Sequence, residues 1–158
     1  MKLSLLCIGK LSADWLQRGA RDYADRIGRY LPLTIEELKE SKAGGKKADK
    51  EQIRQRETEL LLQRISPFSF VVALDERGES VRSEELSRFI GKHMLDGTQD
   101  VTFLIGGAYG LSDKVQQRAD MTLALSVMTL THQMARLLLL EQIYRAMTIL
   151  RNEPYHNR

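Results

Sequence analysis

The residues LALSVMTLTHQMARLLLLEQIYRAM, from Leu123 to Met147, decide the fold of this chain. Residues 123–130 are apolar and hydroxyl-bearing and contain neither glycine nor proline. Thr131 can cap a helix, and residues 132–150 are apolar on most of a helical circumference. A helix with so little polar surface is normally buried on more than one side. Because the chain is short, we expect the second cover to be another copy, in a homodimer.

Three charged residues interrupt the apolar surface of this helix: Arg136, Glu141 and Arg145. Charges in such surroundings cost free energy unless they are paired or used. Both arginines could pair with Glu141 on the surface. Their placement in an apolar helix favours a buried or ligand-facing role instead.

Strands and helices are predicted to alternate along the rest of the chain. Helices are expected to begin after the capping residues Ser12, Asp49, Ser83, Ser112 and Thr131. The strands between them are apolar, and one polar loop, residues 76–82, surrounds Gly78. The predicted strands are residues 2–8, 31–38, 68–74, 101–105 and 121–126. The pattern indicates an α/β fold, a mainly parallel sheet flanked by helices, in a single domain of residues 1–158.

Composition narrows the class of protein. The formal net charge of +3 is compatible with nucleic acid as a partner but does not demand it. Cys7, the single cysteine, lies in an apolar run, so no disulfide framework is expected. No apolar run is long enough for a membrane span and no cleavable signal is visible, which predicts a cytoplasmic protein. Residues 40–50, around Gly44-Gly45, are expected to form a mobile basic loop.

Three strand ends are candidates for a ligand site, because ligands of open α/β sheets bind beyond the carboxyl ends of strands. They are Leu74-Asp75, Gly106-Gly107 and residues 126–130. Backbone amides between the apolar side chains of residues 125–130 suit a flat heterocycle such as adenine. The alternative is that Gly106, Gly107 and Gly110 merely form a tight strand-to-helix turn, which spacing alone favours.

Several common sites are disfavoured. The first strand ends in Ile8-Gly9-Lys10-Leu11 without a G-x-G-x-x-G run, and the chain has no P-loop motif. A dinucleotide or a nucleoside triphosphate is therefore not expected. The histidines have no metal-ligand spacing, so no metal site is expected either. They are His93, His132 and His156.

The residues alone leave two features open. His132 opens the last helix, either as a hydrogen-bonded helix-start residue or as a catalytic group. Tyr155 and His156 lie in a polar tail that is either frayed or able to stack on a base and hold phosphate.

Six motifs then match one family in order from end to end. They are MKLSLLCIGK (1–10), VVALD (71–75), FLIGGAYGL (103–111), LSVMTLTH (125–132), EQIYRA (141–146) and NEPYH (152–156). Together they closely resemble the RlmH family, the pseudouridine N3-methyltransferases of large-subunit ribosomal RNA within the SPOUT superfamily.

The resemblance implies a SPOUT-type fold with a C-terminal trefoil knot, which no composition argument could suggest. It also implies a homodimer with S-adenosylmethionine as cofactor, and large-subunit rRNA of the assembled ribosome as partner. The substrate would be a pseudouridine in the helix 69 loop of 23S rRNA. Carried over by motif, the cofactor-binding residues would be Leu74, Gly106, Gly107, Leu125, Ser126, Val127, Met128, Thr129 and Leu130.

The resemblance further implies the catalytic residues His132, Arg145, Tyr155 and His156. Tyr155 and His156 would cover the target base and reach the cofactor of the partner subunit. Arg145 would orient the tail or bind phosphate. The chain departs from the family where Thr131 replaces a usual proline, and where Asn157 separates His156 from Arg158.

Two rival functions remain from the sequence. One is a SPOUT methyltransferase acting on another RNA such as tRNA. The basic loop around Gly44-Gly45 and the lack of an appended RNA-binding domain argue instead for a target presented by a large particle. The other is a non-catalytic dimeric RNA-binding or assembly factor, which would not bind S-adenosylmethionine.

Overall fold

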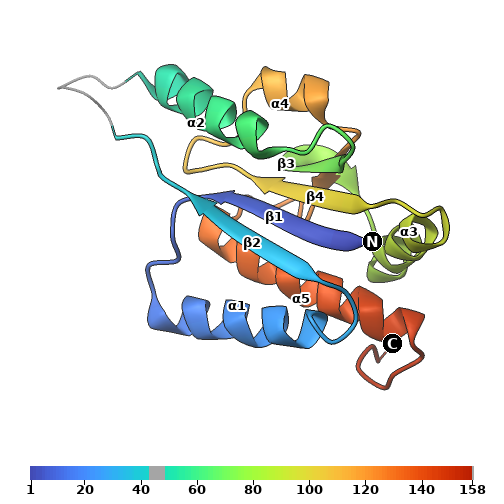
Figure 1. The fold of residues 1–158 in the computed structure, drawn as a ribbon. Coiled ribbons are helices and arrows are strands. Elements are labelled where there is room, and N and C mark those ends of the chain that lie inside the picture. Colours follow the sequence, from blue (N-terminus) through green and yellow to red (C-terminus); the bar gives the residue numbers. More distant parts are fainter. Residues whose placement is uncertain (43–48, 158) are drawn as a thin grey trace.

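A computed structural model describes residues 1–42 and 49–157 of the protein. Its centre is a sheet of five parallel strands in the order β2-β1-β4-β3-β5 (Figure 1). The sheet confirms the predicted α/β architecture. The strands are β1 (Lys2–Ile8), β2 (Leu33–Leu38), β3 (Phe70–Ser80), β4 (Asp100–Ile105) and β5 (Met121–Ala124).

Helices cover both faces of the sheet. In Figure 1, α2 and α4 lie on one face, and α1, α3 and α5 lie on the other. The helices are α1 (Asp14–Ile27), α2 (Lys50–Arg64), α3 (Ser83–Leu95), α4 (Asp113–Arg118) and α5 (His132–Leu150). Since both faces are covered, the central strands must be apolar on both sides, and every residue of β4 is buried.

Alternation along β1 feeds two separate cores. Leu3, Leu5 and Cys7 belong to the core beneath α1, α3 and α5. Leu6 and Ile8 belong to the smaller core beneath α2 and α4. Successive side chains of a strand point to opposite faces, so one apolar run supplies both layers.

The apolar circumference of α5 is covered largely within the chain. The helix packs against the sheet and lies between α1 and α3, with Leu139, Leu140, Ile143, Ala146 and Met147 fully buried. The expectation that a second subunit must supply the other cover does not follow from α5 alone. The homodimer therefore stays a prediction that rests on other grounds.

Strand β3 is longer than the sequence predicts. The polar loop expected from residue 76 is part of the strand, which continues to Ser80 and pairs with β5 again at Glu79 and Ser80. The register shifts between Leu74 and Glu79, so the intervening residues bulge outward. Gly78 allows this, because a Cβ there would lie 2.7 Å from the carbonyl group of Thr122.

Two of the five predicted caps are confirmed by hydrogen bonds. Asp49 accepts from the Glu51 amide at 3.0 Å, and Thr131 accepts from the Met134 amide at 3.2 Å. Ser112 is also the cap residue of α4, although its side chain makes no cap hydrogen bond. The predictions at Ser12 and Ser83 are wrong, because Ser12 precedes the cap residue Ala13 and Ser83 is already inside α3. Ser12 and Ser83 instead bond to glutamines of α5.

The expected mobile loop around Gly44-Gly45 lies outside the described residues. Among the residues that are described, no helix is long and apolar enough to cross a membrane. The trefoil knot stays a prediction.

Candidate functional site

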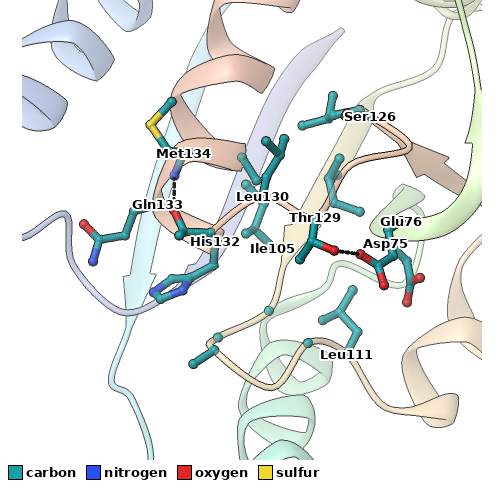
Figure 2. Close-up of a pocket in the computed structure, with 18 of the residues that line it drawn as sticks. Asp75, Glu76, Ile105, Leu111, Ser126, Thr129, Leu130, His132, Gln133 and Met134 are labelled. Atoms are coloured by element: carbon teal, nitrogen blue, oxygen red, sulfur yellow. Dashed lines mark hydrogen bonds between the residues drawn. The ribbon is translucent and has the colours of Figure 1, made fainter.

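One large cavity lies at the carboxyl ends of β4 and β5 and beside the bulge of β3. Its volume is about 1040 Å³, and its walls come from this bulge, from the segments after β4 and β5, and from the start of α5 (Figure 2). This is the edge at which open α/β sheets bind ligands. The three segments singled out from the sequence therefore meet in one place, although Leu74-Asp75 lies within β3 and not at its end.

The glycine turn after β4 forms one wall. The Gly110 amide donates to the carbonyl of Gly107 at 3.0 Å, and Gly110 has a φ of +75°. A Cβ on Gly106 would lie 2.7 Å from the carbonyl group of Gly110. Backbone therefore packs against backbone here, and only glycine leaves the turn this tight.

The segment after β5 forms the opposite wall. Leu125, Ser126, Met128, Thr129 and Leu130 all line the cavity. Its backbone has unused hydrogen-bonding groups, because the amides at positions 127, 129 and 130 have no partner among the described residues. The Thr129 hydroxyl donates to Glu76 at 2.8 Å and so ties this wall to the β3 bulge.

Val127 differs from its neighbours. Its side chain is 88% exposed and it does not line the cavity. The other eight predicted cofactor-binding residues do line it.

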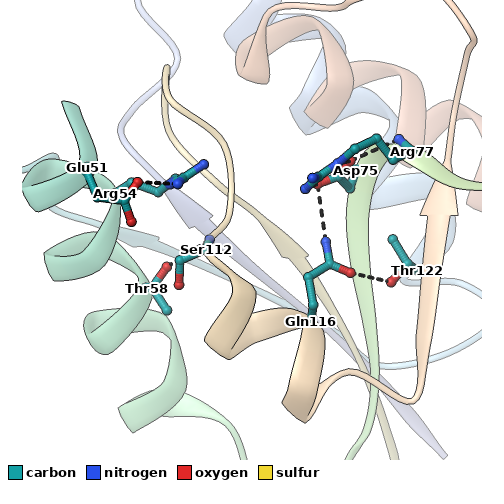
Figure 3. Close-up of polar contacts among 8 residues, drawn as sticks. All are labelled: Glu51, Arg54, Thr58, Asp75, Arg77, Ser112, Gln116 and Thr122. Carbon is teal, nitrogen blue, oxygen red and sulfur yellow. Dashed lines mark hydrogen bonds and ion pairs between the residues drawn. The ribbon is translucent and has the colours of Figure 1, made fainter.

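Asp75 holds the β3 bulge in place. Its carboxylate accepts from the Arg77 guanidinium at 2.8 and 2.9 Å and from the Arg77 amide at 2.9 Å (Figure 3). Gln116 of α4 donates to the same carboxylate at 3.2 Å and accepts from Thr122 at 2.9 Å. The bonds from Arg77 hold the pKa of Asp75 below its usual value, so the carboxylate is ionised at neutral pH.

Glu40 lies beside His132 of the cavity wall, and Glu57 lies beside the glycine turn. The imidazole Nε2 of His132, which lines the cavity, is 3.5 Å from a carboxylate oxygen of Glu40. Glu57 of α2 is 4% exposed, and burial raises the pKa of its carboxyl group. One of its oxygens accepts from the Ser41 amide at 3.0 Å, and the other has no partner among the described residues.

The remaining predicted catalytic residues gather elsewhere, at the far end of α5. Glu141 forms an ion pair with Arg145 and accepts from the Tyr155 hydroxyl at 3.0 Å. The His156 imidazole lies 3.3 Å from Glu84 and 3.5 Å from Arg145. Burial and hydrogen bonds to Tyr23 and Glu141 raise the pKa of Tyr155 above its usual value, so its hydroxyl stays protonated. The tail is thus docked rather than frayed.

The predicted catalytic set is therefore split within one chain. His132 lies at the cavity, and Arg145 is 13 residues further along α5, a rise of about 20 Å. Arg136, which the sequence leaves as buried or ligand-facing, is 1% exposed and is paired with Glu37 and the carbonyl oxygen of Gly9. It pairs away from Glu141, contrary to the surface alternative.

Sequence reasoning misses Trp15 and Arg54, which line the cavity. Trp15 reads as one of the recurring apolar positions of α1, yet it is 55% exposed at the cavity. Arg54 lies on the helix after the basic loop, and no pattern assigns it a role. Among the described residues, no cluster of three or more potential ligands could hold a metal ion.

Comparisons with known proteins agree with this geometry. The family described as "Predicted SPOUT methyltransferase" matches residues 1–156. The "Ribosomal RNA large subunit methyltransferase H" of Syntrophotalea carbinolica is 58% identical over 158 residues, which are 100% of each chain. The protein of the same name from Trichlorobacter lovleyi is 53% identical over 157 residues, 99% of this chain and 100% of that one.

A solved structure of a protein assigned to the methylase family, from Neisseria gonorrhoeae, superposes with a TM-score of 0.56. The sequences are 13% identical, and the superposition covers 99% of this chain and 86% of the other. This likeness shows the fold alone.

Proposed function

The chain belongs to the SPOUT methyltransferase family, and we propose that this methyltransferase modifies large-subunit ribosomal RNA with S-adenosylmethionine as methyl donor. The full-length identity to the two ribosomal RNA large subunit methyltransferases supports the substrate class. The main support for this cofactor is the cavity, in which the glycine turn and residues 125–130 face each other. The specific target that we propose is N3 of a pseudouridine in the helix 69 loop of 23S rRNA. The enzyme would act in the cytoplasm.

The residues of the cavity fit this cofactor. Adenine needs flat apolar contacts and backbone hydrogen-bond partners at its edge. Leu74, Leu125 and Leu130 supply apolar contact, and the free amides at positions 129 and 130 supply donors. The volume is of the size that enzymes use for such ligands. The tight turn at Gly106 lets the ligand approach the main chain.

Methyl transfer does not require a covalent intermediate with the protein. The sulfonium of S-adenosylmethionine supplies an intrinsically good methyl donor. N3 of pseudouridine is an imide nitrogen that must lose its proton before it attacks, so the protein must orient the base and provide for proton removal. His132 is the one imidazole that the described residues place at the cavity.

The split of the predicted catalytic residues supports a dimeric site. Arg145, Tyr155 and His156 lie about 20 Å along α5 from His132, so they do not share the cavity of their own chain. In the homodimer that we propose, this cluster of one subunit covers the cavity of the other. Arg145 and Glu141 fix the tail, and His156 and the protonated Tyr155 then contact the target base.

Methyl transfer from radiolabelled S-adenosylmethionine tests the substrate. Ribosomes from a strain that lacks this gene should accept label on one nucleotide, and mass spectrometry of 23S rRNA should locate it as N3-methylpseudouridine. Label on tRNA instead would support the rival substrate. Calorimetry that shows no heat with S-adenosylmethionine would refute an enzymatic role.

Deletion of residues 154–158 tests the division of labour. The truncated chain should bind S-adenosylmethionine with unchanged affinity, because the cavity is untouched, and should lose methyl transfer. Normal turnover by the truncated chain would contradict a role for the tail.

A further inference from the structure

Trp15 is an exposed aromatic side chain at a place where exposure is unusual. It is the only tryptophan of the chain, it is 55% exposed, and it lines the cofactor cavity. An exposed aromatic ring on the wall of a cavity is available for stacking on a ligand.

Local structure fixes the position of this ring. Trp15 lies in the first turn of α1, and the start of α1 is tied to the start of α5. The Ser12 amide and hydroxyl both donate to the side-chain oxygen of Gln133, at 2.9 and 3.1 Å. Gln17 donates to the Leu11 carbonyl at 2.7 Å. The backbone that carries the indole is therefore fixed beside the cavity before any ligand binds.

The Trp15 ring also has no stacking partner among the described residues. Tyr109, the other exposed aromatic residue of the cavity, has the Lys50 ammonium 5.8 Å from its ring centroid. No aromatic ring or cation of the described residues stacks on Trp15, and its indole N–H has no hydrogen-bond acceptor there. Arg18, three residues later on the same side of α1, is exposed and forms no ion pair with a described residue.

We infer that Trp15 is the stacking platform for an unpaired base of the RNA substrate at the mouth of the cavity, with Arg18 beside it for the RNA phosphate. This inference rests on the proposed function. Aromatic side chains and arginine are the groups by which proteins hold splayed-out bases and their backbone. The deeper wall of residues 125–130 is taken by the cofactor, which leaves the mouth for the nucleic acid.

Kinetics on ribosomes give the first test. Trp15→Ala should raise the KM for ribosomes roughly 10-fold or more, since a stacked base contributes that much to affinity. Trp15→Phe should recover most of the affinity. The dissociation constant for S-adenosylmethionine should not change in either variant. The matched control is Phe68→Ala, because Phe68 is 85% exposed but precedes β3, at the opposite end of the strand from the cavity.

Fluorescence gives the second test, since Trp15 is the only indole. Titration with a pseudouridine-containing RNA hairpin in the presence of S-adenosylmethionine should quench the emission, and S-adenosylmethionine alone should leave it nearly unchanged. Quenching by S-adenosylmethionine alone, with no further effect of RNA, would overturn the inference. So would a Trp15→Ala protein that sediments as a monomer while the unchanged protein is a dimer.

The outcomes separate this inference from the proposed function. If the unchanged protein transfers no methyl group to ribosomes, the proposed function fails. If it does transfer and Trp15→Ala leaves the KM for ribosomes unaltered, only the inference about Trp15 fails.

Discussion

The guanidinium of Arg136 lies 2.6 Å from the carbonyl oxygen of Gly9, the residue that follows β1. The same guanidinium forms an ion pair with Glu37 of β2. One buried side chain of α5 thus joins the last helix to the ends of two neighbouring strands. Because it is 1% exposed, its charge must keep these partners in the folded state.

Replacement of Arg136 by Met should lower the free energy of unfolding by about 3 kcal/mol, since it leaves a carbonyl and a half-buried carboxylate without their partner. Urea denaturation measures this change. The control is Arg64→Met, whose partner Glu36 lies beside Glu37 but whose side chain is 60% exposed. That variant should change the same free energy by less than about 1 kcal/mol. Equal losses in the two variants would contradict the special position of Arg136.

Gly106→Ala should weaken the binding of S-adenosylmethionine by about 10-fold or more, because the new Cβ would meet the backbone of Gly110 at 2.7 Å and open the turn. Calorimetry measures the affinity. Gly28→Ala is the control, because a Cβ at Gly28 meets nothing closer than 3.4 Å and Gly28 is remote from the cavity. An unchanged affinity in Gly106→Ala would show that the turn does not contact the cofactor.

Glu57→Gln should stabilise the protein at neutral pH. Burial raises the pKa of Glu57, so the unfolded chain ionises first as the pH rises above about 4, and stability is lost until the folded carboxyl also ionises. At pH 7 the variant should gain on the order of 1 kcal/mol in the free energy of unfolding, and near pH 4 the gain should vanish. Thermal unfolding across this range measures it. Glu59→Gln, an exposed neighbour on α2, should show no such pH dependence.

Glu141→Gln should reduce the kcat of methyl transfer by about 10-fold, because the Glu141 carboxylate holds both Arg145 and Tyr155. The affinity for S-adenosylmethionine should stay the same, since Glu141 lies outside the cavity. Glu59→Gln again serves as the control. A drop in cofactor affinity without a drop in kcat would place the tail cluster in a different role.

Asp75→Asn should make the free energy of unfolding depend less on pH under acidic conditions. The bonds from Arg77 lower the pKa of Asp75, so the ionised form contributes stability above the usual pKa, and this contribution is lost as the pH falls through the lower folded value. The free energy of unfolding, measured by denaturation between pH 5 and pH 2, should therefore fall less steeply in the variant than in the unchanged protein. A parallel decline in both would show that Asp75 is not held by Arg77 in solution.

The spacing of apolar residues and the capping residues are sufficient to predict much of the fold. The bounds of α5 agree with the prediction from residue 132 to residue 150, because Thr131 caps the helix and its apolar residues have nowhere else to pack. The strand β3 shows where local pattern fails. Its polar second half reads as a loop, and only the pairing of Glu79 and Ser80 with β5 makes it a strand.

The site could be predicted in part for the same reason. The three segments meet because parallel strands share one edge at their carboxyl ends, which follows from topology. The exposure of Trp15 does not follow, because it depends on how α1 packs beside α5. The partners of Arg136 do not follow either, because they depend on how α5 lies against the ends of β1 and β2. A helical period shows which residues share a face, but not which part of that face a neighbour leaves open.

The place of α5 between α1 and α3 has a consequence for how the chain is made. The apolar faces of α1 and α3, which include the buried Leu16 and Ile90, are synthesised long before residues 132–150. Until α5 is present, the apolar side chains of α1, α3 and the sheet that pack against it are exposed to solvent. Folding of this half of the core is therefore completed only after α5 has been synthesised, and a product that lacks α5 should expose apolar surface and aggregate.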